Sequence, residues 1–182
     1  MGGIEMLSDT DQEKVTDKRV LKRSHNLPHW QFGGSVYFVT FRSDRGCLPD
    51  NALKEVKECI VFGHGKKYDL FFAVVMPDHV HMLFRPLRKE KGVWFDLAGI
   101  MKGIKGVSSR RINQVLGTKG RVWMRESFDR MVRDEKEFNV KVDYMYFNPV
   151  KAGLVSDPEN YEFIIRRPYD IGIPDDYFSR GD

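Results

Sequence analysis

The fold is decided by residues 69–86, which read DLFFAVVMPDHVHMLFRP. Residues 69–76 form a nearly continuous apolar run, which is typical of a buried central strand. Pro77 and Asp78 then predict a tight turn, and the alternating residues 79–86 predict a second strand. The stretch therefore predicts a β-hairpin at the centre of a sheet.

Elements predicted on either side of this hairpin give the fold class. Hydrophobic spacing and turn residues predict a loop over 24–34, strands over 35–42 and 121–132, and helices over 51–67, 93–117 and 134–148. The first six elements follow the order strand, helix, strand, strand, helix, strand, which is that of the ferredoxin-like βαββαβ fold. We therefore expect an α+β protein with an antiparallel sheet, helices on one face and a further C-terminal helix.

Length and composition limit the class of protein. The chain has 182 residues, of which 41% are hydrophobic, and this excludes a disordered or collagen-like chain. The sequence indicates one domain over 24–156, between a flexible leader at 1–23 and a tail at 157–182. Two cysteines are too few for a disulfide scaffold or a cysteine zinc cage. No apolar run reaches the roughly 20 residues of a membrane span, and the first residues do not resemble a secretory signal. We expect a cytoplasmic protein.

Charge is unevenly distributed along the chain. Residues 85–133 hold thirteen Lys and Arg against four Asp and Glu, a net charge of +9, whereas the whole chain carries +4. Such a block suits a polyanion such as nucleic acid, although an ordinary solvated surface explains it equally well. The candidate DNA contacts are Lys102, Lys105, Arg110, Arg111, Lys119, Arg121 and Arg125. Trp30, Trp94 and Trp123 are candidates either for stacking on bases or for core packing.

Two histidines lie two residues apart on the second strand of the predicted hairpin. Side chains at that spacing point to the same face of a strand, so His79 and His81 present two imidazoles side by side. Such a pair can bind a divalent metal with at least one more ligand. A pair of solvated histidines is the alternative.

A tyrosine and an asparagine lie one helical turn apart in the last predicted helix. Tyr144 and Asn148 share a face at this spacing. A tyrosine hydroxyl can act as a nucleophile and form a covalent intermediate, and an asparagine oxygen can ligate a metal. Simple packing of this segment against the sheet is the alternative.

These motifs together resemble a known family. MPDHVHMLF at 76–84 and DYMYFNPVKAGLV at 143–155, with the segments 37–42 and 128–135, resemble the REP-associated branch of the single-tyrosine HUH transposases. The resemblance covers residues 24–156. It implies a metal-dependent single-stranded DNA endonuclease and strand transferase that acts on hairpin DNA formed by palindromic repeats. It also implies that His79, His81 and Asn148 hold Mg²⁺ or Mn²⁺, and that Tyr144 forms a 5′-phosphotyrosine.

Two features depart from the family pattern. Asp78 stands where the family usually has Asn, and its carboxylate is expected to raise the pKa values of the histidines. The usual Trp-Ser-Ser after the last helix is replaced by YEFIIRRPYD at 161–170. Homodimer and monomer both remain open, as does a catalytically inactive DNA- or RNA-binding module on the same fold. A DNA-processing protein of this kind is expected at the nucleoid.

Overall fold

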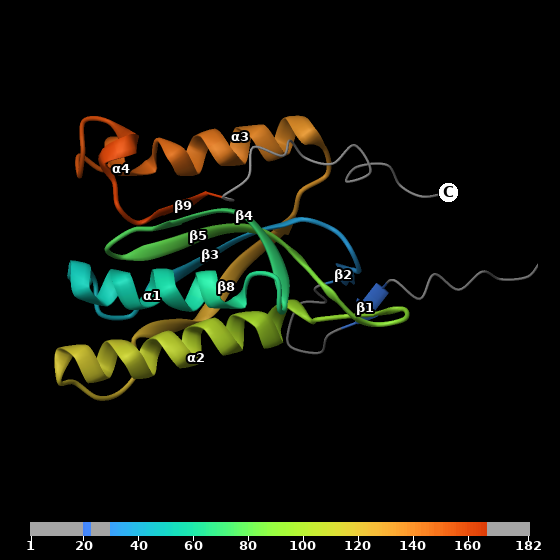
Figure 1. Ribbon diagram of the computed structural model, residues 1–182, viewed down its shortest axis with the longest axis horizontal. Coiled ribbons are helices and arrows are strands. Elements are labelled where there is room, and N and C mark those ends of the chain that lie inside the picture. Colours follow the sequence, from blue (N-terminus) through green and yellow to red (C-terminus); the bar gives the residue numbers. More distant parts are fainter. Residues whose placement is uncertain (1–19, 23–29, 167–182) are drawn as a thin grey trace, which may run out of the picture.

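A five-stranded antiparallel sheet forms the centre of the molecule (Figure 1). The computed structural model describes residues 20–22 and 30–166. The strand order across the sheet is β8 (Trp123–Met131), β3 (Tyr37–Ser43), β5 (His79–Pro86), β4 (Tyr68–Val75) and β9 (Ile164–Arg166). The predicted hairpin is confirmed, because β4 and β5 pair in antiparallel register with Val75 opposite Val80.

Helices cover both faces of this sheet. Figure 1 shows α1 (Asp50–Gly63) and α2 (Leu97–Leu116) on one face and α3 (Glu135–Tyr146) with α4 (Asn148–Lys151) on the other. Smaller elements are the paired strands β1 (Val20–Lys22) and β2 (Trp30–Phe32), the paired strands β6 (Arg88–Glu90) and β7 (Val93–Trp94), and a 3₁₀ turn at Pro158–Asn160. The α+β class is confirmed, and β3, α1, β4, β5, α2 and β8 follow one another in the predicted order.

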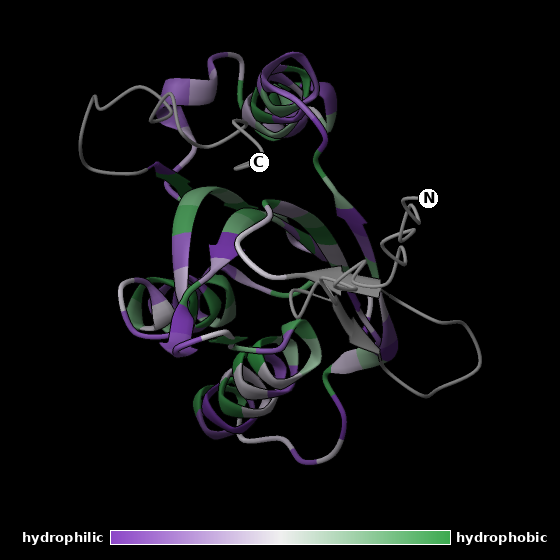
Figure 2. Cartoon of the chain, turned by 90° about the vertical axis from the view of Figure 1, so that its right-hand side faces the viewer, coloured by the Kyte–Doolittle hydropathy of each residue, from purple (hydrophilic) through white to green (hydrophobic). Residues whose placement is uncertain are grey.

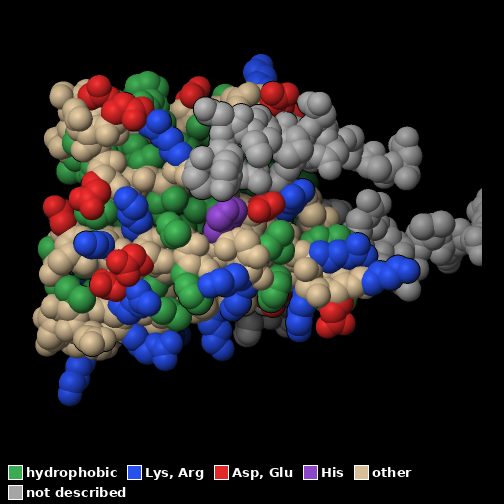
Figure 3. Space-filling view, in the orientation of Figure 1, with side chains coloured by type: hydrophobic (Ala, Val, Ile, Leu, Met, Phe, Trp, Pro, Cys, Tyr) green, Lys and Arg blue, Asp and Glu red, His purple; other side chains and the backbone are tan. Residues whose placement is uncertain are grey.

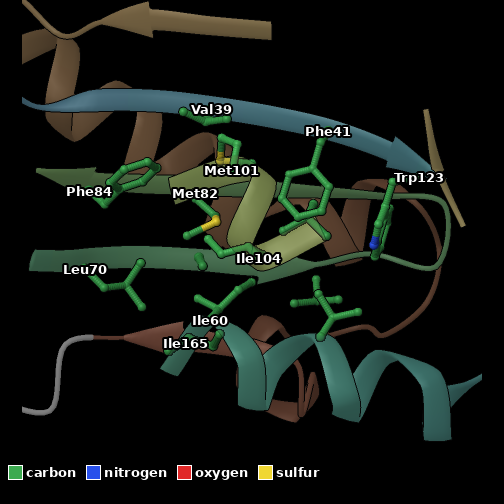
Figure 4. Close-up of a cluster of buried hydrophobic side chains, with 14 of the residues drawn as sticks. Val39, Phe41, Ile60, Leu70, Met82, Phe84, Met101, Ile104, Trp123 and Ile165 are labelled. Carbon is green, nitrogen blue, oxygen red and sulfur yellow. The ribbon is translucent and has the colours of Figure 1, made fainter. Parts of the chain in front are cut away.

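Each face of the sheet has its own hydrophobic core, because strand side chains alternate between the faces. Met82 and Phe84 of β5 pack with Ile60 of α1 and Ile104 of α2 on one face (Figure 4). Leu83 of β5 packs with residues of α3 on the other face. The end-on view in Figure 2 shows the resulting three layers, with the sheet between its helices. The sheet therefore divides the molecule into an α1–α2 face and an α3 face.

All three predicted helices are shorter than their patterns. The helix predicted over 134–148 is α3, which ends at Tyr146, so Asn148 belongs to the separate helix α4. The α1 helix ends at Gly63 instead of residue 67, because His64 after it has an extended backbone. The ring of Tyr68, at the start of β4, lies against Gly63 and leaves no room for a side chain there. The α2 helix begins at Leu97 instead of residue 93, where Asp96 caps it by accepting a hydrogen bond from Gly99 N at 2.5 Å. Residues 93–94 belong to β7.

Short strands occur where the sequence predicted none. The strand β2 lies within the predicted loop at 24–34, β1 within the predicted leader and β9 within the predicted tail. Each is three residues long, which is too short for a periodic pattern to show. The strand β9 forms only when its partner β4 is in place, with Ile165 opposite Ala73. The predicted tail also contains the 3₁₀ turn at Pro158–Asn160. Residues 1–19 and 23 of the leader and 167–182 of the tail lie outside the described residues.

A separate observation concerns membranes. Among the described residues, none of the helices combines the length and the apolar character that crossing a bilayer requires.

Candidate active site

The two histidines of β5 lie on the α3 face of the sheet. The ring centroids of His79 and His81 are 4.6 Å apart, with the rings inclined at 71°. Their intervening neighbour Val80 belongs to the core on the opposite face. The alternation expected from the sequence therefore brings the two imidazoles together.

His81 has one ring nitrogen in contact with a hydroxyl and one without a partner. Its Nδ1 lies 2.7 Å from Thr40 Oγ1 on the neighbouring strand β3, and its Nε2 is buried without a hydrogen-bond partner. Burial, with the positive charges of His79 and Arg42, lowers the pKa of His81 to about 3. The Asp78 carboxylate acts on the pKa of His81 in the expected, raising direction, but burial outweighs it and the net shift is downward. A buried polar atom without a partner is costly, and a metal would satisfy it.

His79 is oriented by the carboxylate beside it. Its Nδ1 lies 2.7 Å from Asp78 Oδ1. A carboxylate only accepts hydrogen bonds, so His79 donates from Nδ1, and in the neutral ring the lone pair is on Nε2. Burial alone would raise the pKa of Asp78, but the hydrogen bond to His79 and the nearby charges of His79 and Arg42 lower it. Both histidines thus have the outer hydrogen bond that typically fixes the orientation of a metal-binding imidazole.

Tyr144 of α3 lies against this pair in the same chain. Its ring centroid is 5.3 Å from that of His81, with an edge-on inclination of 67°. The side chain is 42% exposed, so an incoming DNA strand can reach it. The structure therefore brings Tyr144, from the motif in α3, next to His81, from the motif in β5.

The second tyrosine of the motif is engaged elsewhere. The Tyr146 hydroxyl donates a hydrogen bond to Glu159 Oε1 at 2.5 Å, and the Arg166 guanidinium lies 4.6 Å from its ring centroid. The hydrogen bond with Glu159 is the main cause that raises the pKa of Tyr146. Tyr144, not Tyr146, is thus the tyrosine that faces the histidines.

Asn148 is placed one turn after Tyr144. It is the first residue of α4, it is only 9% exposed, and Phe147 before it keeps a right-handed helical backbone. Its amide oxygen and the two imidazole nitrogens are donors that suit a divalent ion. Among the described residues no group of three or more His, Cys, Asp or Glu could hold a metal.

Three cations around the histidines were missed in the sequence. Arg42 lies opposite His79 in the register of β3 and β5. The Lys141 ammonium is 4.6 Å from the ring centroid of Phe38, which itself stacks on His81 at 5.3 Å. The Lys151 ammonium is 5.6 Å from the ring centroid of Tyr144. Lys141 is three residues before Tyr144 in α3, which is the helical spacing that could have identified it. Lys151 is seven residues after Tyr144 in the separate helix α4, and no simple helical spacing indicated it.

The predicted DNA contacts in α2, Lys102 and Arg110 among them, lie on the other face of the molecule, and Lys119 and Arg125 follow in the connection to β8 and in β8 itself. Figure 3 shows Lys and Arg side chains projecting along the lower edge, where Figure 1 places α2. Lys102, Arg110, Lys119 and Arg125 are exposed, and none of them has an acidic partner within the described part of the chain.

The other three predicted contacts have partners in the protein. Arg111 pairs with Glu55 and Glu58 of α1, and Arg121 pairs with Asp44 at 2.8 Å. Lys105 donates to the backbone oxygen of Arg125 at 2.8 Å, which ties α2 to β8. Their charges are therefore already partly neutralised or used to hold the fold.

Of the candidate stacking tryptophans, Trp123 is buried in the core and Trp94 is partly exposed. Trp123 is 3% exposed and its indole nitrogen donates to Ser108 Oγ at 2.9 Å, so it is a core residue. Trp94 is partly exposed, with its ring against Gly33 and the Arg88 guanidinium 5.7 Å from its centroid. The side chain of Trp30 lies outside the described residues.

Comparisons with known proteins agree with this arrangement. The family model described as "Transposase IS200 like" matches residues 37–141. The REP-associated tyrosine transposase of Escherichia coli (strain K12) is 24% identical over 133 residues, which are 72% of this chain and 75% of the relative. A relative from Haemophilus influenzae is 22% identical over 94 residues, which are 49% of this chain and 53% of its own.

A solved structure supports the fold independently. The REP-associated tyrosine transposase bound to a REP hairpin superposes with a TM-score of 0.62 and 21% identity, over 78% of this chain and 82% of that one. The family model covers β3 to most of α3, which includes the histidine pair but ends before Tyr144. The chain therefore belongs to the IS200-like transposase family and is similar to the REP-associated tyrosine transposases.

Proposed function

We propose that this protein cuts and rejoins single-stranded DNA through a covalent bond to Tyr144, with a divalent metal, at hairpin-forming sequences. One observation carries the proposal. The exposed ring of Tyr144 lies 5.3 Å from the ring of His81, whose buried Nε2 has no partner in the protein. A nucleophile and an unused metal-ligand atom thus lie side by side in one chain.

The metal would be held by His79, His81 and Asn148. The unused Nε2 of His81 and the two oriented imidazoles fit such an ion, and the Nδ1 bonds to Asp78 and Thr40 keep both rings in place. Two imidazoles and one amide oxygen suit Mn²⁺ better than Mg²⁺, which prefers oxygen ligands. When bound, Mg²⁺ or Mn²⁺ would supply Lewis-acid polarisation of the phosphate.

Tyr144 would perform the covalent step. Its Oη attacks the phosphorus of the scissile phosphodiester as the phosphorus–O3′ bond breaks, which leaves a 5′-phosphotyrosine and a free 3′ oxygen. The tyrosine proton passes to solvent and the 3′ oxygen is protonated in turn. A 3′-hydroxyl can later attack the phosphotyrosine and release Tyr144. One ester replaces another in each step, so no nucleotide triphosphate is consumed.

The cations beside the site would position the DNA backbone. Arg42, Lys141 and Lys151 lie around His79, Phe38 and Tyr144, and charged donors at such distances attract phosphate groups. Hairpin DNA is proposed as the substrate because the similar solved structure is described as bound to a REP hairpin. Since Tyr144 and His81 meet within one chain, a monomer can assemble the site.

The test is formation of a covalent adduct. Purified protein is incubated in the presence of Mn²⁺ with labelled DNA hairpins that have palindromic stems and single-stranded flanks. A band of protein joined to DNA on a denaturing gel is expected, and EDTA or His81→Ala should remove it.

Matched tyrosine variants identify the nucleophile. Tyr144→Phe should abolish the adduct and leave hairpin binding unchanged, whereas Tyr146→Phe should keep the adduct. Binding without an adduct across all hairpins would instead indicate a catalytically inactive DNA-binding module. An adduct that persists in Tyr144→Phe would contradict the assignment of Tyr144.

A further inference from the structure

An exposed aromatic side chain lies beside the histidines without a role in the chemistry above. Phe128 of β8 is 60% exposed, although it stands in a strand of the central sheet. Only Phe62, on the opposite face of the molecule, is more exposed among the large hydrophobic side chains of the described residues. Single exposed apolar residues are common, so the position of Phe128 decides whether it has a function.

Strand register places Phe128 in one row with His81. Thr40 of β3 is opposite His81 of β5 on one side and opposite Phe128 of β8 on the other. Residues directly opposite in antiparallel strands lie on the same face of the sheet. Phe128 therefore shares the α3 face with His81, two strand spacings or about 10 Å away.

The α3 helix leaves this side chain uncovered. The next residue on the same side of β8, Arg130, pairs with Glu137 in the first turn of α3 at 2.8 Å, so the helix begins beyond Phe128. Before Phe128, the register of β8 shifts between the partners of Phe41 and Ser43, and irregularities of this kind are common beside functional sites at sheet edges. The edge strand thus presents one flat apolar ring next to the site.

The charges around this row suit a nucleic-acid strand. Arg42 follows Thr40 on the same face two residues along β3, and Lys141 lies over Phe38 two residues before it. Glu126 of β8, two residues before Phe128, is an acid beside this row, and its charge also acts on Lys105 of α2. An exposed aromatic ring flanked by cations is the arrangement on which unpaired bases stack.

We propose that Phe128 stacks on an unpaired base next to the scissile phosphate and so sets which phosphodiester bond faces Tyr144. The proposal rests on the proposed function and adds a positioning residue to it. About 10 Å separates Phe128 from His81, which suits a base that flanks the phosphate. Phe128 makes no bond to the reacting atoms, so its effect is on binding and on the cleavage position.

The experiment measures binding in the Tyr144→Phe background, where no cleavage interferes. The probe is a fluorescent DNA hairpin with a single-stranded oligothymidine flank, in which one flank nucleotide at a time is replaced by an abasic spacer. The hairpin fixes the register of the flank. One position should lose about 5- to 150-fold in affinity, the range that one aromatic–base stack supplies.

A Phe128→Ala exchange in this background should remove that sensitivity. Its affinity for the intact flank should fall by the same factor, and the abasic probe should bind no more weakly than the intact one. Phe128→Trp should restore the sensitivity, which a purely structural role would not require. Phe62→Ala is the matched control for loss of an exposed phenyl ring and should leave the abasic profile unchanged.

The outcomes separate this proposal from the proposed function. If no flank position is sensitive, or if Phe128→Ala keeps the sensitivity of the parent, the stacking proposal is overturned even when the wild-type protein forms its adduct. If the adduct fails but the abasic profile depends on Phe128, the proposed chemistry fails and stacking stands. A change in sedimentation of Phe128→Ala without any change in the abasic profile would instead assign the ring to contact between copies of the chain.

Discussion

At the scale of single residues, the metal site proposed above depends on the orientation of the histidine rings. The Nδ1 of His81 lies 2.7 Å from Thr40 Oγ1, so Thr40→Val replaces the acceptor by a methyl group of nearly the same shape. Loss of such an outer hydrogen bond typically lowers metal affinity about 10- to 100-fold. We expect Thr40→Val to weaken Mn²⁺ binding by this factor in a titration followed by electron paramagnetic resonance.

A conservative variant at the same position is the control for this experiment. Thr40→Ser keeps the hydroxyl and should bind Mn²⁺ nearly as tightly as the wild type, while both variants should unfold at similar urea concentrations. Equal Mn²⁺ affinity of the valine and serine variants would show that the Thr40 hydrogen bond does not orient a metal ligand.

The site could be predicted from the sequence only as far as local periodicity reaches. The spacing of His79 and His81, and that of Tyr144 and Asn148, predicted two pairs of side chains, and the structure brings Tyr144 to His81. Thr40 could not be predicted, because it lies 41 residues from His81 in the chain and meets it only through strand register. Register is set by which face of each strand the core buries, and that is a property of the assembled sheet.

At the scale of elements, alanine substitutions at two helical glycines are expected to change stability in opposite directions. A Cβ at Gly63, at the end of α1, would collide with the ring of Tyr68, whereas a Cβ at Gly106, inside α2, would meet nothing within 4 Å. Gly63→Ala should lower the free energy of unfolding by about 1–3 kcal/mol through overpacking. Gly106→Ala should raise it by about 0.5–1 kcal/mol, because alanine favours the helix. Urea denaturation measures both, and equal signs would contradict the packing of α1 on β4.

The contact between α2 and β8 gives a second prediction at this scale. Trp123 donates its indole N–H to Ser108 Oγ, and Ser108 in turn donates to Ile104 O. Ser108→Ala would leave the buried indole nitrogen without a partner, at a cost of about 1–3 kcal/mol in the free energy of unfolding. The partly exposed Ser109 is the control, and Ser109→Ala should change stability much less.

The same contact shows why Trp123 could not be assigned from the sequence. The sequence pattern of one strand does not distinguish a buried tryptophan from an exposed one. In β8, Trp123 is buried although the other residues of the strand are mostly exposed. Its burial follows from the edge contact with Phe41, at 4.9 Å between centroids, and from the position of α2. Measured DNA affinity should therefore be the same in Ser108→Ala as in the wild type at temperatures where both are folded.

At the scale of the whole molecule, the sheet lies between two positively charged surfaces, one around the histidine pair and one on α2. The histidine pair and Tyr144 lie on the α3 face, whereas Lys102 and Arg110 project from α2 on the opposite face. If these α2 cations hold DNA phosphates, each charge-removing variant should reduce the slope of log affinity against log salt by about 0.7–0.9. Arg111→Ala is the control, because Arg111 already pairs with Glu55 and Glu58, and its slope should stay near that of the wild type.

Binding and chemistry should then be separable in one molecule. Lys102→Ala combined with Arg110→Ala changes only the surface behind the sheet, so at saturating hairpin DNA the rate of adduct formation should equal that of the wild type, while the affinity at physiological salt falls. Tyr144→Phe should show the reverse, with affinity retained and no adduct. Single-turnover rates across a range of DNA concentrations distinguish the two effects, because a binding defect moves the half-saturating concentration and a chemical defect moves the plateau. A lower plateau in the α2 variant would mean that the sheet does not insulate the two faces, and that DNA held on α2 also sets the position of the phosphate at Tyr144.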